Sequence, residues 1–163
     1  MELIERIDEY FRRLSILKFI SIMVLCSYLV TLPLIPLFEI FQVDDMGGPD
    51  AVKESAPILE FILAVVIAPI IETFIFQAAI FYILRKFAFF RERISVVIIV
   101  STLAFGMAHS YSFLYVLYGL SIGAVLAYSY NVYIGKSCSS FLVVTMIHSV
   151  RNMIAFALGV LGS

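Results

Sequence analysis

The chain has 163 residues, of which 63% are hydrophobic and only 14% are charged. Soluble domains carry about 25% charged residues, so this composition excludes an ordinary soluble enzyme and indicates a protein embedded in lipid. The net charge of -1 lacks the basic excess that a nucleic-acid partner requires, so we expect no such partner.

Residues 1–14 predict an amphipathic helix at the membrane surface. Apolar residues recur along one helical stripe, while acidic and basic residues take the other positions. The segment lacks the basic start and the cleavage site of a signal peptide and runs directly into a longer apolar block. We therefore expect it to be retained as an interfacial helix.

Five apolar blocks are long enough, or nearly so, for membrane-spanning helices of about 20 residues. They cover residues 17–41, 58–84, 94–108, 113–130 and 139–161. Pro33 and Pro36 should kink or end the first helix, and the short third block is expected to borrow residues 87–90. The pattern predicts an all-α, polytopic helix bundle with about five transmembrane helices, forming a single membrane domain over residues 1–163.

Basic residues predict the orientation of the bundle, because Lys and Arg in short loops mark the cytoplasmic side. A cytoplasmic N-terminus leaves only Lys53 outside and places the other loop cations inside. These are Arg6, Arg12, Arg13, Lys18, Arg85, Lys86, Arg91, Arg93 and Lys136. We expect an integral protein of a prokaryotic cytoplasmic membrane, with Cys26 and Cys138 at different depths as free thiols.

Several polar side chains lie inside the apolar blocks, where an ionisable group costs about 2.5–3.5 kcal/mol and usually marks function. They are Glu72, Gln77, His109, His148, Arg151 and Asn152. Both histidines of the chain belong to this set. A lone histidine in a bundle is commonly a hydrogen-bonded core residue, but two histidines together with a glutamate and an asparagine favour a shared catalytic site.

Helical spacing places some of these residues on common faces, because positions four apart project from the same side. The pairs are Glu72 with Phe76, Phe105 with His109, and His148 with Asn152. Three helices can thus each offer a polar stripe to one cavity. By the same spacing Arg151 is expected to face away from His148, and we assign it no role.

Three short motifs lie on these three helices. Residues 68–77 read APIIETFIFQ, residues 105–109 read FGMAH, and residues 148–152 read HSVRN. In this order they resemble the motifs APxxEExxFR, FxxxH and HxxxN of the CAAX protease and bacteriocin-processing (CPBP, or Abi) family of intramembrane proteases. The resemblance covers roughly residues 68–152 and implies a helical membrane fold around a polar cavity, with peptide-bond hydrolysis as the reaction.

The resemblance implies that Glu72, His109, His148 and Asn152 are the catalytic residues. Thr73, Phe76, Gln77 and Phe105 would support them. Thr73 and Gln77 replace the second Glu and the Arg of the family motif, so an anion and a cation are lost together. We expect a neutral hydrogen bond between these two residues in place of the ion pair.

Hydrolysis requires a base for water and donors for the developing oxyanion. Glu72 is the best base available, with His109 holding the water and with His148 and Asn152 facing the oxyanion. Alternatively, Glu72, His109 and His148 could hold Zn²⁺, although no HExxH motif is present. The sequence leaves Zn²⁺ and no metal both open as cofactor choices.

Two other functions compete with this one. Residues 119–123 spell GxSxG and offer Ser121 as a nucleophile, but Gly119, Gly123 and Ala127 also form a small-residue seam for helix packing, which is the stronger interpretation. The replacements at Thr73 and Gln77 motivate a catalytically silent membrane protein that binds a membrane protein partner, as an immunity factor or a complex subunit. The enzyme hypothesis instead expects membrane lipid and a peptide or lipidated protein substrate.

Overall fold

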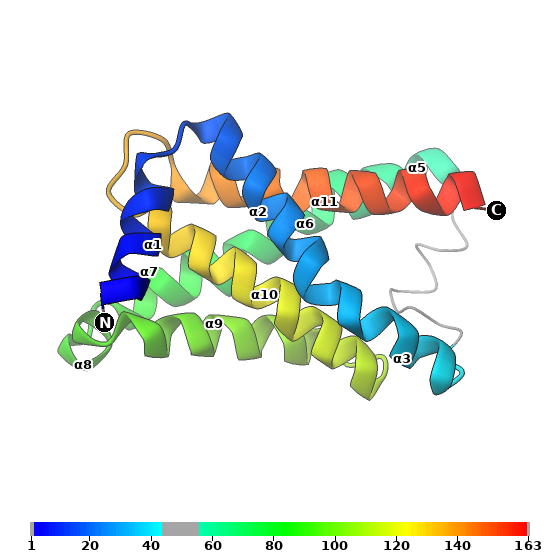
Figure 1. Ribbon diagram of the computed structural model, residues 1–163, viewed down its shortest axis with the longest axis horizontal. Coiled ribbons are helices and arrows are strands. Elements are labelled where there is room, and N and C mark those ends of the chain that lie inside the picture. Colours follow the sequence, from blue (N-terminus) through cyan, green and yellow to red (C-terminus); the bar gives the residue numbers. More distant parts are fainter. Residues whose placement is uncertain (1, 44–55, 163) are drawn as a thin grey trace.

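The computed structural model describes residues 2–43 and 56–162, and every regular element in these ranges is a helix (Figure 1). Four segments are long and apolar enough to cross a membrane, and a shorter apolar helix accompanies them. This confirms the predicted all-α bundle of about five apolar helices. The elements are α1 (Glu2–Arg13), α2 (Ile16–Thr31), the 3₁₀ turn η1 (Leu32–Leu34), α3 (Ile35–Ile40), α5 (Pro57–Phe61), the π-helical segment η2 (Ile62–Ile67), α6 (Ala68–Glu72), the π-helical segment η3 (Thr73–Ala79), α7 (Ile80–Leu84), α8 (Ala88–Glu92), α9 (Ile94–Ala108), α10 (Phe113–Tyr133) and α11 (Ser140–Gly162).

Helix α1 is the amphipathic segment expected at the N-terminus, and it packs across the end of α10. The ring of Phe11 contacts those of Phe19 and Tyr128, at centroid distances of 6.1 and 6.0 Å. Arg12 donates to the backbone oxygen of Val132 at 3.1 Å. The last carbonyls of a helix have no partner within it, so this side chain completes the end of α10.

Proline interrupts the first span at the predicted place. Helix α2 ends at Thr31, the 3₁₀ turn carries Pro33, and α3 begins with Pro36 in its first turn. Proline removes a backbone donor and its ring clashes with a carbonyl of the preceding turn, so a regular α-helix cannot continue through either residue. The expected break is confirmed.

The second span is one continuous helix over residues 57–84, but it is not regular. The π-helical segments η2 and η3 flank α6, which ends at Glu72. Pro69 lies in the first turn of α6 and cannot donate a backbone hydrogen bond, which is a known cause of such local irregularity. A π-helix bonds each residue to the one five positions along, so the turns of η2 and η3 are wider than those of an α-helix.

Helix α9 has the bounds predicted for the third span, but the expectation that it borrows residues 87–90 is wrong. Arg93 separates α8 from α9 with φ −122° and ψ 66°, which is not a helical conformation, so the chain turns there. With 15 residues, α9 is about 22 Å long at 1.5 Å per residue.

Helices α9 and α10 approach closely along a glycine seam. A Cβ atom on Gly106 would lie 2.5 Å from a side chain of α10, and one on Gly123 would lie 3.1 Å from Phe105. A Cβ atom on Gly119 would meet both Gly106 and His109 at 3.3 Å. The predicted small-residue seam is confirmed, and it sets the end of α9 directly against α10.

The main core lies between α2, α9, α10 and α11. It includes Phe19, Met23, Phe105, Leu126, Val144 and Ile147. Large apolar side chains also cover much of the outer surface, as Leu29 and Phe74 do with exposed fractions of 56% and 59%. A soluble protein would bury such residues, so these outward faces suit contact with lipid tails. Cys26 and Cys138 are free thiols, as expected.

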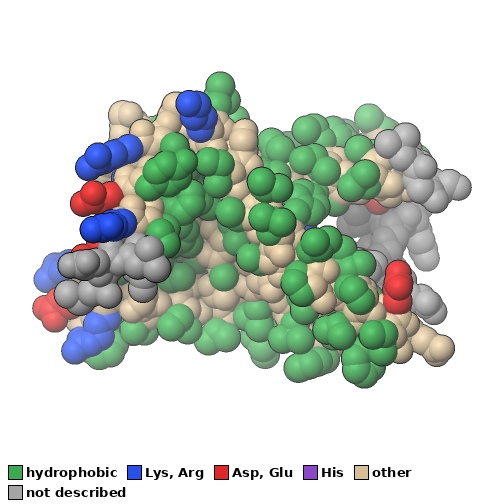
Figure 2. All heavy atoms as spheres, in the orientation of Figure 1, with side chains coloured by type: hydrophobic (Ala, Val, Ile, Leu, Met, Phe, Trp, Pro, Cys, Tyr) green, Lys and Arg blue, Asp and Glu red, His purple; other side chains and the backbone are tan. Residues whose placement is uncertain are grey.

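Basic side chains gather at one end of the bundle. Figure 2 shows Lys and Arg groups at the end that holds α1 and α8, with apolar side chains over the middle of the molecule. The nine cations used to predict orientation lie in α1, at the start of α2, between residues 85 and 93, or in the turn after α10. Lys53 lies outside the described residues.

Candidate active site

Three spans bring Glu72, His109 and His148 together in the interior of the bundle. The Oε2 atom of Glu72 lies 3.8 Å from Nε2 of His109 and 3.7 Å from Nε2 of His148. The exposed side-chain fractions are 25% for Glu72, 19% for His109 and 5% for His148, so Glu72 is the most accessible member. Both separations are too long for direct hydrogen bonds and fall in the range that a water molecule bridges.

The end of α9 fixes the proton position on His109. This residue caps the helix, and its Nδ1 atom lies 2.7 Å from the backbone oxygen of Phe105. A carbonyl oxygen only accepts hydrogen bonds, so Nδ1 must carry the proton. In the neutral ring, Nε2 therefore presents a lone pair toward Glu72.

An aromatic wall supports both histidines. The Phe105 ring lies 4.5 Å from the His109 ring and 5.7 Å from the His148 ring, measured between centroids. Phe76 packs edge-on against Phe105 at 5.6 Å. Phe105 is 1% exposed, so this wall is rigid and dry. Both aromatic residues that the sequence analysis placed beside the site are found there.

The side chain of Asn152 supplies a hydrogen bond that the backbone near Pro69 lacks. The N–H of Ala68 bonds to the oxygen of Leu63, and Pro69 has no N–H, so neither residue donates to the carbonyl of Ala64. The Nδ2 atom of Asn152 donates to this carbonyl at 2.9 Å. Since a part-buried carbonyl inside an apolar bundle needs a partner, the contact stabilises the span on the N-terminal side of Glu72. One N–H of the Asn152 amide remains for the oxyanion role expected from the sequence.

Comparison with known proteins connects this geometry to a family. A family model described as type II CAAX prenyl endopeptidase Rce1-like matches residues 54–154, more than half of the chain. The chain belongs to this family. The match contains all three motifs and confirms the resemblance to CPBP proteases drawn from them. No curated protein and no solved structure matches the chain. At the level of the family, Rce1-like membership supports an intramembrane protease of the CAAX type.

Thr73 and Gln77 depart from the CPBP motif and are both fully buried. The hydroxyl of Thr73 and both polar atoms of the Gln77 amide have no hydrogen-bond partner within the described part of the chain. The neutral hydrogen bond expected between them is therefore not formed, and that prediction is wrong. A spacing of four residues brings the two side chains to one side of the helix, but it does not turn their polar atoms toward each other.

Arg151 is the residue that the sequence analysis misjudged. It is 4% exposed, its Nη2 atom donates to the hydroxyl of Tyr118 at 2.6 Å, and its guanidinium lies over the rings of Tyr28 and Tyr118 at 5.3 and 5.1 Å. Among the described residues, no carboxylate pairs with it. Arg151 is three positions after His148, and residues three apart in a helix also lie on one face. This spacing could have predicted from the sequence that Arg151 points into the bundle.

Glu72, His109 and His148 are the three residues that the sequence offered as ligands for Zn²⁺. Among residues 2–43 and 56–162, no group of three His, Cys, Asp or Glu side chains has an arrangement that could hold a metal ion. Zinc sites require ligand atoms about 2.0–2.2 Å from one shared point. The side chains of Glu72, His109 and His148 do not fit Zn²⁺ as they stand, and we derive no step through it.

Ser121, the alternative nucleophile, lies apart from the histidines. Its hydroxyl donates to the backbone oxygen of Leu117 at 2.9 Å, the usual bond of a serine within a helix. It lines a cavity that also contains Met23 and Cys26 of α2. A serine nucleophile needs an adjacent base, and no histidine lines this cavity.

Proposed function

We propose that this protein is an intramembrane endopeptidase that hydrolyses a peptide bond in a membrane-associated or lipidated peptide or protein. The observation that carries the proposal is the position of the Glu72 carboxylate, within 4 Å of Nε2 of both His109 and His148. A carboxylate and two imidazoles held inside an apolar bundle have the composition that general acid–base hydrolysis needs.

Glu72 acts as the base. It removes a proton from a water molecule held between its carboxylate and the Nε2 lone pair of His109, and the water oxygen bonds to the peptide carbonyl carbon. Glu72 then gives the proton to the amide nitrogen as the carbon–nitrogen bond breaks. This transfer regenerates the carboxylate and releases an acid and an amine.

His148 donates to the oxyanion that develops during attack. Its Nε2 atom faces the cluster, and its Nδ1 atom has no hydrogen-bond partner among the described residues, so the ring can carry its proton on Nε2. Removing one such donor typically lowers the rate by about 10²–10³. In this proposal Asn152 is a positioning residue instead of the oxyanion donor expected from the sequence, since its amide holds the backbone segment that leads to Glu72.

The unsatisfied polar atoms of Thr73 and Gln77 are proposed contacts for the peptide backbone of the substrate. Buried polar groups without partners are uncommon, and each calls for an explanation. Thr73 follows Glu72 directly and Gln77 lies further along η3, and both side chains are fully buried, so this contact requires the neighbouring spans to part when the substrate binds. A peptide backbone would then supply both donors and acceptors to match these atoms. Membrane lipid is the expected surrounding, and the substrate itself is the expected partner.

The test compares Glu72→Gln with Glu60→Gln, a matched change near the start of the same span. Glu72→Gln keeps the shape of the side chain but removes the base, so we expect no turnover of a quenched lipidated peptide in liposomes, with helix content unchanged. Glu60→Gln should cleave like the wild type. Near wild-type cleavage by Glu72→Gln would overturn the proposal. Prolonged chelation should leave wild-type turnover unchanged, whereas a loss restored by Zn²⁺ would refute the metal-free mechanism.

A catalytically silent binding protein is the second candidate, favoured by the loss of the family's charged pair at Thr73 and Gln77. It predicts that the chain captures a membrane protein partner and that the double variant Glu72→Ala, His148→Ala captures it equally well. A protease would instead bind its substrate in this variant and fail to cut it.

A further inference from the structure

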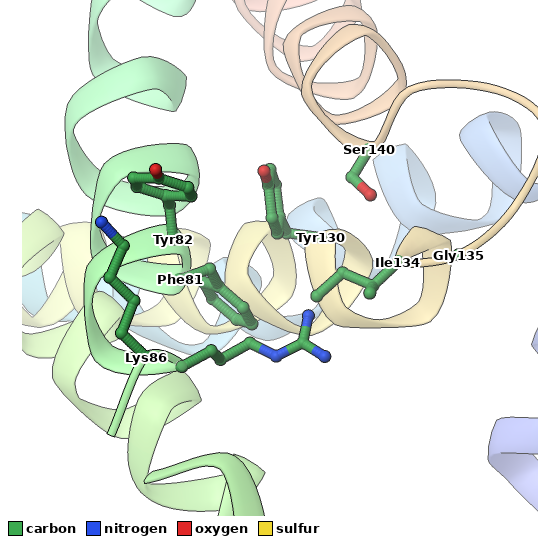
Figure 3. A pocket seen from close by; sticks show the side chains of 8 residues that line it. Phe81, Tyr82, Lys86, Tyr130, Ile134, Gly135 and Ser140 are labelled. Atoms are coloured by element: carbon green, nitrogen blue, oxygen red, sulfur yellow. The ribbon is translucent and has the colours of Figure 1, made fainter. Parts of the chain in front are cut away.

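A second site lies at the basic end of the bundle, away from Glu72. A cavity of about 380 Å³ opens between the ends of α7 and α10 and the start of α11. Figure 3 shows the side chains around it, with those of Tyr82 and Lys86 on one side and those of Tyr130 and Ser140 on the other. Arg85 also lines it, and no lining residue is acidic. The proposed protease function uses none of these residues.

The cavity concentrates positive charge that no carboxylate of the described residues neutralises. Neither Arg85 nor Lys86 has a carboxylate partner among the described residues, and the Lys86 ammonium lies 4.1 Å above the ring of Tyr82. Tyr130 and Ser140 add hydroxyl groups to the lining. A forked guanidinium, an ammonium and hydroxyl donors together match the several oxygens of a phosphate group.

The backbone at the start of α11 adds to this charge. Ser140 is the first residue of this 23-residue helix, and the first N–H groups of a helix have no partner within it. They carry the positive end of the helix dipole, which attracts anions. Gly135, at φ 81°, has the left-handed conformation that lets the chain turn beside the cavity before α11 begins.

Apolar surface continues outward from the cations. Phe81 forms part of the lining, and Tyr82, Ile83 and Phe87 are exposed by 69%, 52% and 57%. Hydrocarbon chains can lie along these side chains while a charged headgroup enters the cavity. Basic pockets between spans at a membrane surface bind anionic headgroups in this manner.

We propose that this cavity binds the phosphate headgroup of an anionic phospholipid. The lipid is the source of the phosphate, because the cations and the exposed apolar strip are adjacent, and a free phosphate would use only the cations. The volume of about 380 Å³ lies within the roughly 300–1,000 Å³ range of ligand pockets.

The experiment measures binding of phosphatidylglycerol to the purified protein in neutral-detergent micelles, with phosphatidylcholine and glycerol 1-phosphate as the comparison ligands. The test variant is Arg85→Gln with Lys86→Gln. The matched control is Arg91→Gln with Arg93→Gln, which removes the same charge from the same end but outside the cavity lining. A third variant, Ser140→Leu, fills the cavity without changing charge.

We expect phosphatidylglycerol to bind more tightly than either comparison ligand. Juxtamembrane cations contribute about fivefold each, so the test variant should bind roughly 25-fold more weakly, with the control pair near wild type. Ser140→Leu should also weaken binding while helix content stays the same. An equal loss in the control pair, or no loss in Ser140→Leu, would show charge attraction without a site and overturn the proposal. Equal affinity for glycerol 1-phosphate would overturn the assignment to lipid.

Discussion

A proline and an asparagine 83 positions apart, Pro69 and Asn152, act on the same backbone carbonyl. The proline removes the donor that would bond to Ala64, and the asparagine side chain replaces it from another helix. The position of Glu72, three residues after Pro69, therefore depends on a hydrogen bond made by α11. At the scale of single residues, the geometry of the candidate site is coupled to the hydrogen bonding of the backbone near Pro69.

This coupling predicts a rescue. Asn152→Leu leaves the carbonyl of Ala64 buried without a donor and should lower the free energy of unfolding by about 1–3 kcal/mol. Pro69→Ala restores a backbone N–H nearby, so the double variant should be more stable than the sum of the single changes predicts. Denaturant titration of the four proteins in detergent measures this.

Activity assays on the same four proteins separate two roles of Asn152. A positioning residue should regain much of its lost turnover when Pro69→Ala is added. If stability recovers but turnover stays low, then Asn152 contacts the reacting atoms directly and the positioning role is wrong.

Replacing Gln77 is expected to raise stability and lower activity. Gln77→Met keeps the length of the side chain and removes two buried polar atoms that lack partners, so we expect higher thermal stability. If these atoms bind the peptide backbone of the substrate, kcat/KM should fall at the same time. Thr73→Val is the companion variant. A rise in both stability and kcat/KM would mean that Gln77 makes no contact with substrate.

Sequence spacing predicted part of this arrangement. It placed Glu72, His109 and His148 in one cavity because each is a polar residue within an apolar span, and the three side chains do lie together. It misjudged Arg151 because only the four-residue spacing was weighed. It did not foresee the bond between Asn152 and Ala64, since that bond depends on π-helical turns that leave no mark in hydrophobic periodicity.

At the scale of helices, the glycine seam decides how near His109 comes to the rest of the site. Gly106→Ala would place a methyl group 2.5 Å from the side chain of Leu120, so α9 and α10 must separate or distort. Overpacking of this kind costs about 1–3 kcal/mol. We expect lower stability and a larger loss of turnover than in Gly159→Ala, whose added methyl group meets nothing within 4 Å.

Gly159→Ala should be neutral or slightly stabilising, because alanine favours a helix more than glycine does. Thermal melts and peptide cleavage by the two variants therefore compare the same chemical change at a crowded and an open position. Equal behaviour of both variants would contradict the role of the seam.

The elements themselves were largely predictable. Long apolar runs and prolines marked the spans, and the predicted bounds of α9 agree with the structure. Residues 87–90 were assigned wrongly, because a run of aromatic residues at the membrane surface resembles a span by composition. The non-helical backbone conformation at Arg93 ends α8 before α9 begins. Apolar content does not predict such a local conformation.

At the scale of the whole molecule, the uneven distribution of charge predicts orientation. Reporters fused after Val43 should read extracytoplasmic, and reporters fused after Phe90 should read cytoplasmic, because basic loops stay inside. Paired alkaline phosphatase and green fluorescent protein fusions measure both positions. The reverse pattern would place the basic end outside and contradict the orientation.

The short length of α9 has a consequence for the surrounding bilayer. A helix of about 22 Å cannot match a hydrocarbon layer about 30 Å thick. Lipids beside α9 must shorten or tilt to meet it, at a cost of a fraction of a kcal/mol per ångström. His109 caps the end of this helix, so thinning of the bilayer there would bring headgroups and hydration toward Glu72. The protein should therefore cleave faster in vesicles of short-chain lipids than in thick, sterol-rich ones. Hydrophobic mismatch would then determine in which membranes the protein is active.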